Sequence, residues 1–193
     1  GLSDENAIGV RLEGHEDYVF DALVYDCHGK PAAVSYGQDE SLLFWDLVNG
    51  KPLRPVIQNA VYEMQLYKEK GRQLGFSGYT DATLQRWDLE EGKPLGAILD
   101  GHDSFVNGIL IYEVAGKPIA LTWSDDKTLR RWDLALGREF GCPFEGHTKE
   151  VNGALLYELD GRNSALSWSS DGTLRCWDLS VHNAVSTVLK GHE

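Results

Sequence analysis

A histidine, a hydroxyl residue and an aspartate recur at fixed spacing along this chain. His102 precedes Thr122 by 20 positions and Asp126 by 24 positions. In hydrolases, these residue types form a triad in which the imidazole takes the proton of a nucleophilic hydroxyl and the carboxylate orients the imidazole. The same offsets select two further sets, His15, Ser35 and Asp39, and His147, Ser167 and Asp171.

A structural interpretation competes with the hydrolase and is favoured. The set occurs three times, and an enzyme has no use for three equivalent nucleophiles. A tryptophan also follows each set at a fixed distance, as Trp132 follows Asp126 by six positions. A linked imidazole, hydroxyl, carboxylate and indole N–H can satisfy one another when buried, whereas single buried polar groups are costly. The sequence therefore predicts buried histidines, no enzymatic activity, no catalytic residue, no cofactor and no metal site.

Two dipeptides divide the chain into four repeats of about 45 residues. Trp-Asp begins at positions 45, 87, 132 and 177, and Gly-His begins at 14, 101, 146 and 191. The second repeat lacks its Gly-His, because position 24 before Asp81 is Ile57 and the preceding link is three residues shorter. We expect Ile57 to fill the histidine's place by packing, and Asp81 to be held by Ser77, the N–H of Thr83 or water. The predicted structural residues are His15, Ser35, Asp39, Trp45, Ser77, Asp81, Trp87, His102, Thr122, Asp126, Trp132, His147, Ser167, Asp171 and Trp177.

Each repeat also contains four short apolar runs rich in β-forming residues. In the third repeat they cover 105–112, 118–123, 128–134 and 139–144. Glycine-containing turns separate them, as a hairpin that needs positive φ requires. Helical periodicity is absent. The sequence thus predicts an all-β protein with a four-stranded antiparallel sheet in each repeat.

A repeat of this length, with Gly-His near its start and Trp-Asp near its end, resembles the WD40 family of β-propellers. The resemblance implies that each repeat is one blade, and that the repeated His, Ser/Thr, Asp and Trp form a hydrogen-bonded chain inside it. It also implies a single domain over 1–193. The expected parts are an outer strand of a preceding repeat at 1–13, repeat 1 at 14–57, a degenerate repeat 2 at 58–100, repeat 3 at 101–145, and repeat 4 with the start of the next at 146–193.

WD40 propellers bind partners through their loops, so the resemblance implies a non-catalytic scaffold or docking domain for a protein or peptide. The loop after each Gly-His and the turn with each repeated Asp should share one face. One alternative is a propeller that binds a small ligand in its channel or on exposed tryptophans. Another is a fragment of the C-terminal sensor array of a bacterial signalling NTPase or kinase. The candidate partner-binding residues are Tyr18, Gln38, Phe105, Asp125, Lys149 and Glu150.

The aromatic residues that follow the repeated hydroxyls have a core interpretation and a binding interpretation. Large rings on a blade's second strand are suited to fill the space between neighbouring blades. A stacking platform for a ligand would instead need them exposed. We expect the core role for these positions, which are Tyr36, Gly78, Trp123 and Trp168.

Composition narrows the class of partner. A formal net charge of −12 repels phosphate backbones, so nucleic acid is not expected as a partner. No apolar run approaches the length of a membrane span. Three widely spaced cysteines form neither a disulfide framework nor a zinc motif. We expect a soluble, cytoplasmic protein that does not contact a membrane.

Blade number predicts self-association. Propellers close with about six to eight blades in the shape expected here, so four blades leave two apolar end faces in water. Two copies related by a two-fold axis would make an eight-bladed ring, with a four-bladed monomer as the rival. Two stretches, 7–12 and 184–189, would then compete for one outer-strand position. The sequence thus predicts a homodimer.

Overall fold

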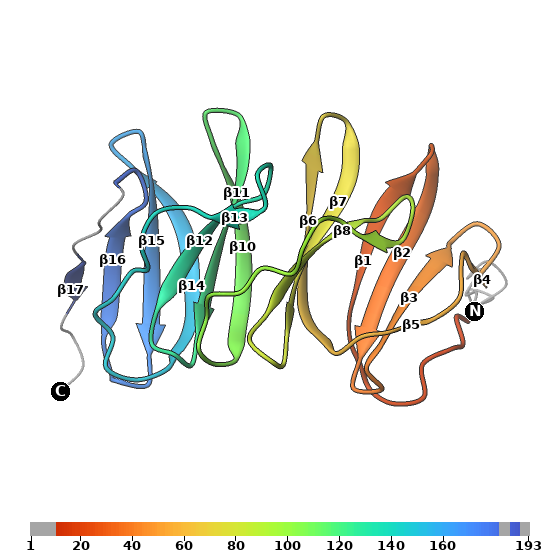
Figure 1. Ribbon diagram of the computed structural model, residues 1–193, viewed down its shortest axis with the longest axis horizontal. Helices are drawn as coiled ribbons and strands as arrows, with labels where there is room; N and C mark the ends of the chain where they lie inside the picture. The colour runs from red at the N-terminus through yellow and green to blue at the C-terminus, as the bar shows by residue number, and fades with distance from the viewer. Residues whose placement is uncertain (1–10, 182–185, 190–193) are drawn as a thin grey trace, which may run out of the picture. The chain divides into compact units, whose positions relative to one another are not determined.

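The computed structural model describes residues 11–181 and 186–189 of the chain. All regular structure within them is β, in four antiparallel sheets, one for each repeat (Figure 1). The predicted all-β fold, with one blade per repeat, is confirmed. Among the described residues there is no helix of the length and apolarity needed to cross a membrane.

Each blade is a meander whose strands pair in chain order. Blade 1 contains β1 (Val19–Cys27), β2 (Lys30–Gly37), β3 (Ser41–Asp46), β4 (Lys51–Pro52) and β5 (Ile57–Gln58). Its outer strand is divided, because β4 and β5 both pair with β3. Blade 2 contains β6 (Val61–Glu69), β7 (Arg72–Tyr79), β8 (Leu84–Asp88) and β9 (Lys93–Pro94). Blade 3 contains β10 (Val106–Val114), β11 (Lys117–Ser124), β12 (Leu129–Asp133) and β13 (Arg138–Glu139). Blade 4 contains β14 (Val151–Leu159), β15 (Arg162–Ser169), β16 (Leu174–Asp178) and β17 (Thr187–Leu189).

Two-residue turns join the first two strands of every blade. In blade 3 both turn residues have positive φ, 49° at Ala115 and 72° at Gly116. Such turns match the twist of the flanking strands, and glycine adopts their geometry without steric cost. The predicted glycine turns are thus present in the structure.

The first strand of each blade contains a β-bulge near its start. In blade 3 the register with β11 shifts between Val106 and Gly108, so Asn107 has no direct partner across the ladder. Bulges re-aim a side chain at the end of a sheet. The residues at this position in the four blades are Phe20, Tyr62, Asn107 and Asn152.

The chain divides into two compact units, Gly1–Ala60 and Val61–Glu193, where the sequence predicts one domain. Blade 1 forms the first unit, and blades 2 to 4 form the second. In repeat proteins each repeat contacts only its neighbours, so a chain can divide at a link between repeats. Ile57–Gln58 belongs to the sheet of blade 1, and the first strand of blade 2 begins at Val61.

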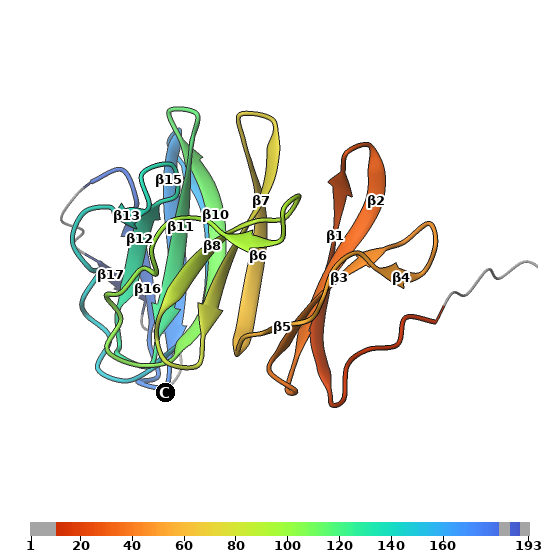
Figure 2. The same ribbon diagram turned by 45° about the vertical axis from the view of Figure 1, so that its right-hand side comes forward.

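Within the second unit, neighbouring sheets pack face to face around two apolar cores (Figure 1, Figure 2). We call the face that meets the following blade the forward face, and the face that meets the preceding blade the backward face. The core between blades 3 and 4 joins a forward face with a backward face. The forward face of blade 3 supplies Tyr112, Ile119, Leu121, Trp123, Leu129 and Phe144. The backward face of blade 4 supplies Val151, Ala154, Ala165, Trp177 and Leu179.

A buried arginine fastens blade 3 to blade 4. The Arg131 guanidinium donates to the backbone carbonyls of Leu179 and Val181 over 2.7 and 3.0 Å. It also lies over the rings of Phe140 and Phe144, at 5.1 and 4.6 Å from their centroids. A planar guanidinium can satisfy several acceptors and stack at once, which suits it to a buried junction.

The sequence predicts that the stretches 7–12 and 184–189 compete for one outer-strand position. Most of the stretch 7–12 lies outside the described residues, as do 182–185 and 190–193. Thr187–Leu189 forms β17 and pairs with β16, the outer-strand position of blade 4.

Candidate functional site

The four repeated residue types of blade 3 form a continuous hydrogen-bonded chain. The indole N–H of Trp132 donates to the hydroxyl oxygen of Thr122 over 2.8 Å. That hydroxyl lies 2.7 Å from Nε2 of His102, whose Nδ1 lies 2.7 Å from a carboxylate oxygen of Asp126. One tautomer satisfies every group: Nδ1–H donates to the carboxylate, and Nε2 accepts from the hydroxyl. Asp126 also accepts from the N–H of Asp103, so the chain ties the loop after Gly-His to the following turn.

Blades 4 and 1 repeat this geometry. In blade 4, Ser167 lies 2.7 Å from Nε2 of His147 and accepts the Trp177 N–H over 2.8 Å. His147 Nδ1 lies 2.9 Å from Asp171. In blade 1 the corresponding distances are 2.7, 2.8 and 3.0 Å, and they join His15, Ser35, Trp45 and Asp39. His102 and His147 are buried, and the side chain of His15 is only 8% exposed.

The surroundings hold the aspartates ionised and a histidine neutral near pH 7. Burial would raise the pKa of Asp126, but hydrogen bonds from His102 and Thr128 outweigh it and hold that pKa well below its usual range. In blade 1 burial is again outweighed by hydrogen bonds, and the pKa of Asp39 falls to about 2. Burial lowers the pKa of His147 in spite of its hydrogen bond to an aspartate. A neutral imidazole between a carboxylate and a hydroxyl is the arrangement that the tautomer above requires.

The hydrogen-bonded set of His, Ser/Thr, Asp and Trp is poorly suited to nucleophilic catalysis. Thr122 and Ser167 are fully buried, so their hydroxyl oxygens are inaccessible to a substrate carbonyl. Each hydroxyl oxygen also accepts an indole N–H, which lowers its nucleophilicity. What the arrangement supplies is rigidity, because it fixes two loops to the inside of one sheet.

Blade 2 lacks the histidine, and the prediction for Ile57 is wrong. Ile57 lies in β5 and pairs with Leu42, as Leu99 pairs with Leu84 in the next blade. From Leu99 to Val106 the chain takes seven steps, whereas from Ile57 to Val61 it takes four. The three missing residues are therefore the loop that carries Gly-His elsewhere, and a deletion in a loop leaves the outer strand in place.

Asp81 is held locally in the absence of a histidine. It accepts from the N–H of Thr83 over 3.1 Å and from the Thr83 hydroxyl over 2.6 Å. The N–H of Thr83 was one of the predicted donors. Ser77 instead accepts the Trp87 indole N–H over 2.9 Å and donates to the carbonyl of Gln85.

The predicted partner-binding residues lie on the loops that the hydrogen-bonded chains anchor. In the second unit the N–H of Asp125 donates to the carbonyl of Phe105 over 3.0 Å, and Ser170 makes the equivalent bond to Glu150 over 3.1 Å. In blade 1 the N–H of Gln38 donates to the carbonyl of Tyr18 over 2.7 Å. In each of these blades the loop and the turn lie side by side at one end of the sheet, which we call the loop end. Tyr18, Gln38, Lys149 and Glu150 are exposed, and Phe105 and Asp125 are half-buried.

Tyr62, at the loop end of blade 2, is not among the residues that the sequence predicts for this surface. The Tyr62 ring packs edge-to-face on Phe105 of blade 3, with centroids 4.6 Å apart, while Tyr62 remains 39% exposed. In the next blades the bulge residue is polar: Asn107 donates to Asp125 over 2.7 Å, and Asn152 donates to Ser170 over 3.1 Å. Aligning the repeats one residue after each strand-initial valine would have found this position.

The residues that follow the repeated hydroxyls do not all fill gaps between blades. Tyr36, Gly78 and Trp123 are buried, as expected of core positions. Trp168, in contrast, is 38% exposed, against 8% for Trp123. A ligand platform would need exposed indoles that converge on a hollow. Trp177 lines the hollow on blade 4 but is buried, and Trp168 does not line it.

Comparison with known proteins identifies the fold. No protein-family profile and no curated protein matches the chain. Among solved structures, the protein U3-55K superposes with a TM-score of 0.71 at 23% identity, over 94% of this chain and 54% of that chain. The computationally designed protein Ika8 gives a TM-score of 0.69 at 23% identity, over 93% of this chain and 51% of that chain. The computationally designed protein Ika4 gives 0.68 at 26% identity, over 87% and 95%.

These likenesses show a β-propeller fold. The chain spans about half the length of U3-55K and of Ika8, and nearly the whole length of Ika4. At such identities the comparison concerns the arrangement of strands and carries no statement about partners.

Proposed function

We propose that this chain is a non-catalytic scaffold that binds a protein or peptide at the loop end of its blades. The observation that carries the proposal is the Tyr62–Phe105 pair, an aromatic contact between the β6 bulge of blade 2 and the loop after His102, which the hydrogen-bonded chain of blade 3 anchors. Aromatic residues are enriched among the residues that dominate binding energy at protein interfaces. A pre-ordered surface also loses little conformational entropy on binding.

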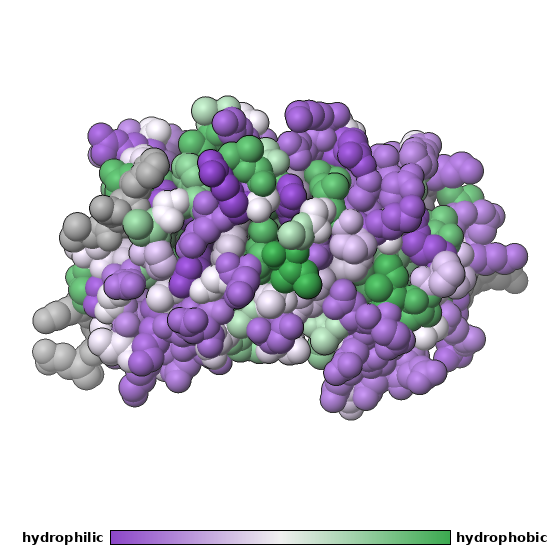
Figure 3. Space-filling model, in the orientation of Figure 1, coloured by the Kyte–Doolittle hydropathy of each residue, from purple (hydrophilic) through white to green (hydrophobic). Residues whose placement is uncertain are grey.

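Charge supports a protein partner over a nucleic acid. The formal net charge is −12, and the exposed residues Asp103 and Glu150 place carboxylates beside the aromatic pair or on the neighbouring loop. Such a field disfavours a phosphate backbone and favours a peptide with basic residues. The space-filling view in Figure 3 shows a largely hydrophilic surface with separate hydrophobic patches.

The proposal extends to the cellular compartment of the protein and to the larger protein that could contain this chain. The three cysteines, Cys27, Cys142 and Cys176, are thiols and not disulfides, which supports a reducing compartment such as the cytoplasm. A role as a sensor or docking array within a larger bacterial signalling protein rests on the WD40 resemblance alone.

A quantitative pull-down from an extract of the source cells tests the proposal. We expect wild-type protein to retain a defined partner, and Tyr62→Ala and Phe105→Ala each to weaken that retention at least about tenfold, the scale of one interface hot spot. Tyr18→Ala extends the test to blade 1. Lys68→Ala is the matched control, because Lys68 is exposed near the β6–β7 turn, at the other end of the sheet.

Thermal melts of all variants check that the fold is intact. Full retention by the three aromatic variants, with loss on changing Lys68, would place the binding surface at the opposite end and refute the proposal.

A further inference from the structure

The forward face of blade 4 has the residues of a packed blade face but is open to solvent. Blade 4 covers the equivalent face of blade 3, where Leu121 is fully buried and Trp123 is 8% exposed. On blade 4 the equivalent Leu166 is half-buried and Trp168 is 38% exposed. Leu155, on the same face, is 57% exposed. Contiguous exposed apolar surface of this kind marks an interaction site.

The backward face of blade 1 is exposed along β1, whereas Ala33 and Trp45 on the same face are buried. Val19 is 51% exposed, whereas Val106 and Val151, at the same position in blades 3 and 4, are fully buried. Val24, two residues beyond Ala22 on the same side of β1, is 66% exposed.

These two faces repeat, residue by residue, the pair that meets between blades 3 and 4. Blade 4 covers blade 3 with Val151, Ala154, Ala165, Trp177 and Leu179. Blade 1 has the same five residue types at the equivalent positions, namely Val19, Ala22, Ala33, Trp45 and Leu47. Blade 3 has Val106, Ile109, Ala120, Trp132 and Leu134 there, so it differs at the second position.

At the two junctions of the second unit, that second position is large where the preceding blade has a small residue and small where it has a ring. Ile109 of blade 3 faces blade 2, which has Gly78 where other blades have a ring. Ala154 of blade 4 faces blade 3, which has Trp123. Close packing in a core pairs large residues with small ones. Ala22 of blade 1 therefore suits a facing blade with a tryptophan, and blade 4 supplies Trp168.

We propose that the forward face of blade 4 binds the backward face of blade 1 in a second copy of this chain, and that two such junctions join a pair of copies. In this pair each apolar end face is covered by a face of the same type as the one that covers it in the junction between blades 3 and 4. The proposal goes beyond the scaffold function and is independent of it, because it uses the faces of the sheets and not the loop end.

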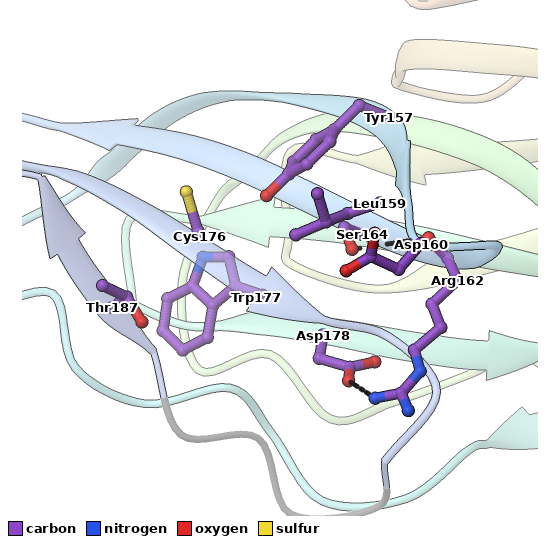
Figure 4. A pocket seen from close by; sticks show the side chains of 9 residues that line it. All are labelled: Tyr157, Leu159, Asp160, Arg162, Ser164, Cys176, Trp177, Asp178 and Thr187. Atoms are coloured by element: carbon purple, nitrogen blue, oxygen red, sulfur yellow. Dashed lines mark hydrogen bonds and ion pairs between the residues drawn. The ribbon is translucent and has the colours of Figure 1, made fainter.

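A hollow on the forward face of blade 4 fits the proposed contact. It measures about 300 Å³ and is lined by residues that include Tyr157, Leu159 and Cys176 (Figure 4). Cys176 stands where blade 3 has Arg131, whose long side chain occupies the equivalent place and reaches the Leu179 carbonyl. The second copy would bring Leu47, the equivalent of Leu179, to this hollow. Without the arginine the junction lacks its two charge-assisted hydrogen bonds, so it is weaker than the internal one.

Solution mass as a function of concentration tests the proposal. Light scattering on the full chain should give twice 21.5 kDa at micromolar concentration and above. A mass of one chain throughout, as a closed four-bladed monomer would give, overturns the proposal, and so does a series of larger multiples.

Two variants on opposite faces locate the junction. Leu155→Glu and Val24→Glu place a charge on side chains that are exposed in the single chain, so each should shift the mass to one chain. The melting temperature of each variant should equal that of the wild-type protein at a concentration low enough to dissociate the pair. Leu136→Glu is the matched control, since Leu136 is also 57% exposed but lies in the turn after β12 of blade 3 and so belongs to neither blade 1 nor blade 4. A dimer that survives both face variants, or dissociates equally with the control, refutes the assignment.

Mixing the two face variants tests the polarity of the junction. A Leu155→Glu copy keeps its blade 1 face, and a Val24→Glu copy keeps its blade 4 face, so the mixture has one intact junction and should partly recover the dimer. An interface of one face with itself would give no recovery.

The missing arginine allows a gain-of-function variant. Arg86 of blade 2 reaches the Leu134 carbonyl of blade 3 over 2.6 Å, so an arginine at this position can bridge neighbouring blades. Cys176→Arg should therefore lower the dissociation constant of the pair roughly tenfold, the scale of one hydrogen bond to a charged group. An unchanged or higher constant would contradict the proposed geometry.

Discussion

Replacing His102 by alanine should destabilise the protein without affecting its surface. The histidine is buried and makes one hydrogen bond to a carboxylate and one to a hydroxyl, both of 2.7 Å. Truncation removes both bonds and leaves a space beside Trp132, whose ring centroid lies 6.2 Å from that of the imidazole.

The magnitude follows from what each partner retains. Asp126 keeps the N–H groups of Asp103 and Thr128 and the Thr128 hydroxyl, so it is not stranded. Thr122 keeps the indole N–H of Trp132. A hydrogen bond to a charged group contributes about 1.5–3 kcal/mol and a neutral one about 0.5–1.5 kcal/mol. Because the partners stay largely satisfied, we expect a loss of about 1–3 kcal/mol in the free energy of unfolding.

Urea denaturation followed by tryptophan fluorescence measures this loss. The matched control is His28→Asn, because His28 is exposed in the β1–β2 turn at φ 55°, a conformation that asparagine tolerates. The control should change the free energy of unfolding by less than about 0.5 kcal/mol, as most surface substitutions do. A His102→Ala variant as stable as this control would refute the structural role of the chain.

Three further predictions concern pH, the buried arginine and a hairpin turn. Because burial lowers the pKa of folded His147 below 6.5, its contribution to stability is full above pH 6.5 and is lost as pH falls through the folded pKa; the contribution of Asp39 is full above pH 3.8 and is lost towards pH 2. Urea midpoints measured from pH 8 to pH 2 should therefore fall in two steps, and a midpoint that rises below pH 6.5 would contradict the assignment. Arg131→Met should cost about 2–4 kcal/mol by leaving two carbonyls of blade 4 without a donor, and Arg86→Met, which removes one such bond from a half-buried side chain, should cost less; equal costs in thermal melts would be evidence against the clamp. Ala115→Asn should raise the free energy of unfolding by roughly 0.5–1 kcal/mol, because asparagine adopts positive φ more readily than alanine, and an unchanged melting temperature would show that the turn does not limit stability.

The sequence alone determined the fold and the inner hydrogen-bonded chains. Trp-Asp, Gly-His and the hydroxyl recur at constant offsets, and constant offsets in repeated units place equivalent side chains at equivalent points of each sheet. The distances in blades 1, 3 and 4 agree to within 0.3 Å for this reason, from 2.7 to 3.0 Å at the histidine–aspartate contact.

Where a repeat loses residues, the sequence could not say which element is shortened. Counting back 24 positions placed Ile57 at the histidine position, whereas the deletion falls in the loop and Ile57 stays in its strand. Strand pairing is maintained by hydrogen bonds to a neighbour, while loops tolerate length changes, so a position count fails across such a deletion.

Tertiary structure decided which of several like residues are covered. Trp123 and Trp168 follow identical local patterns, yet one is buried by the next blade and the other is exposed. Tyr62 lies at the bulge of β6, and its ring packs on Phe105 of the following blade at the loop end. Burial depends on what packs against a face, which is a property of neighbours distant in sequence, whereas the offsets of a repeat describe each sheet in isolation.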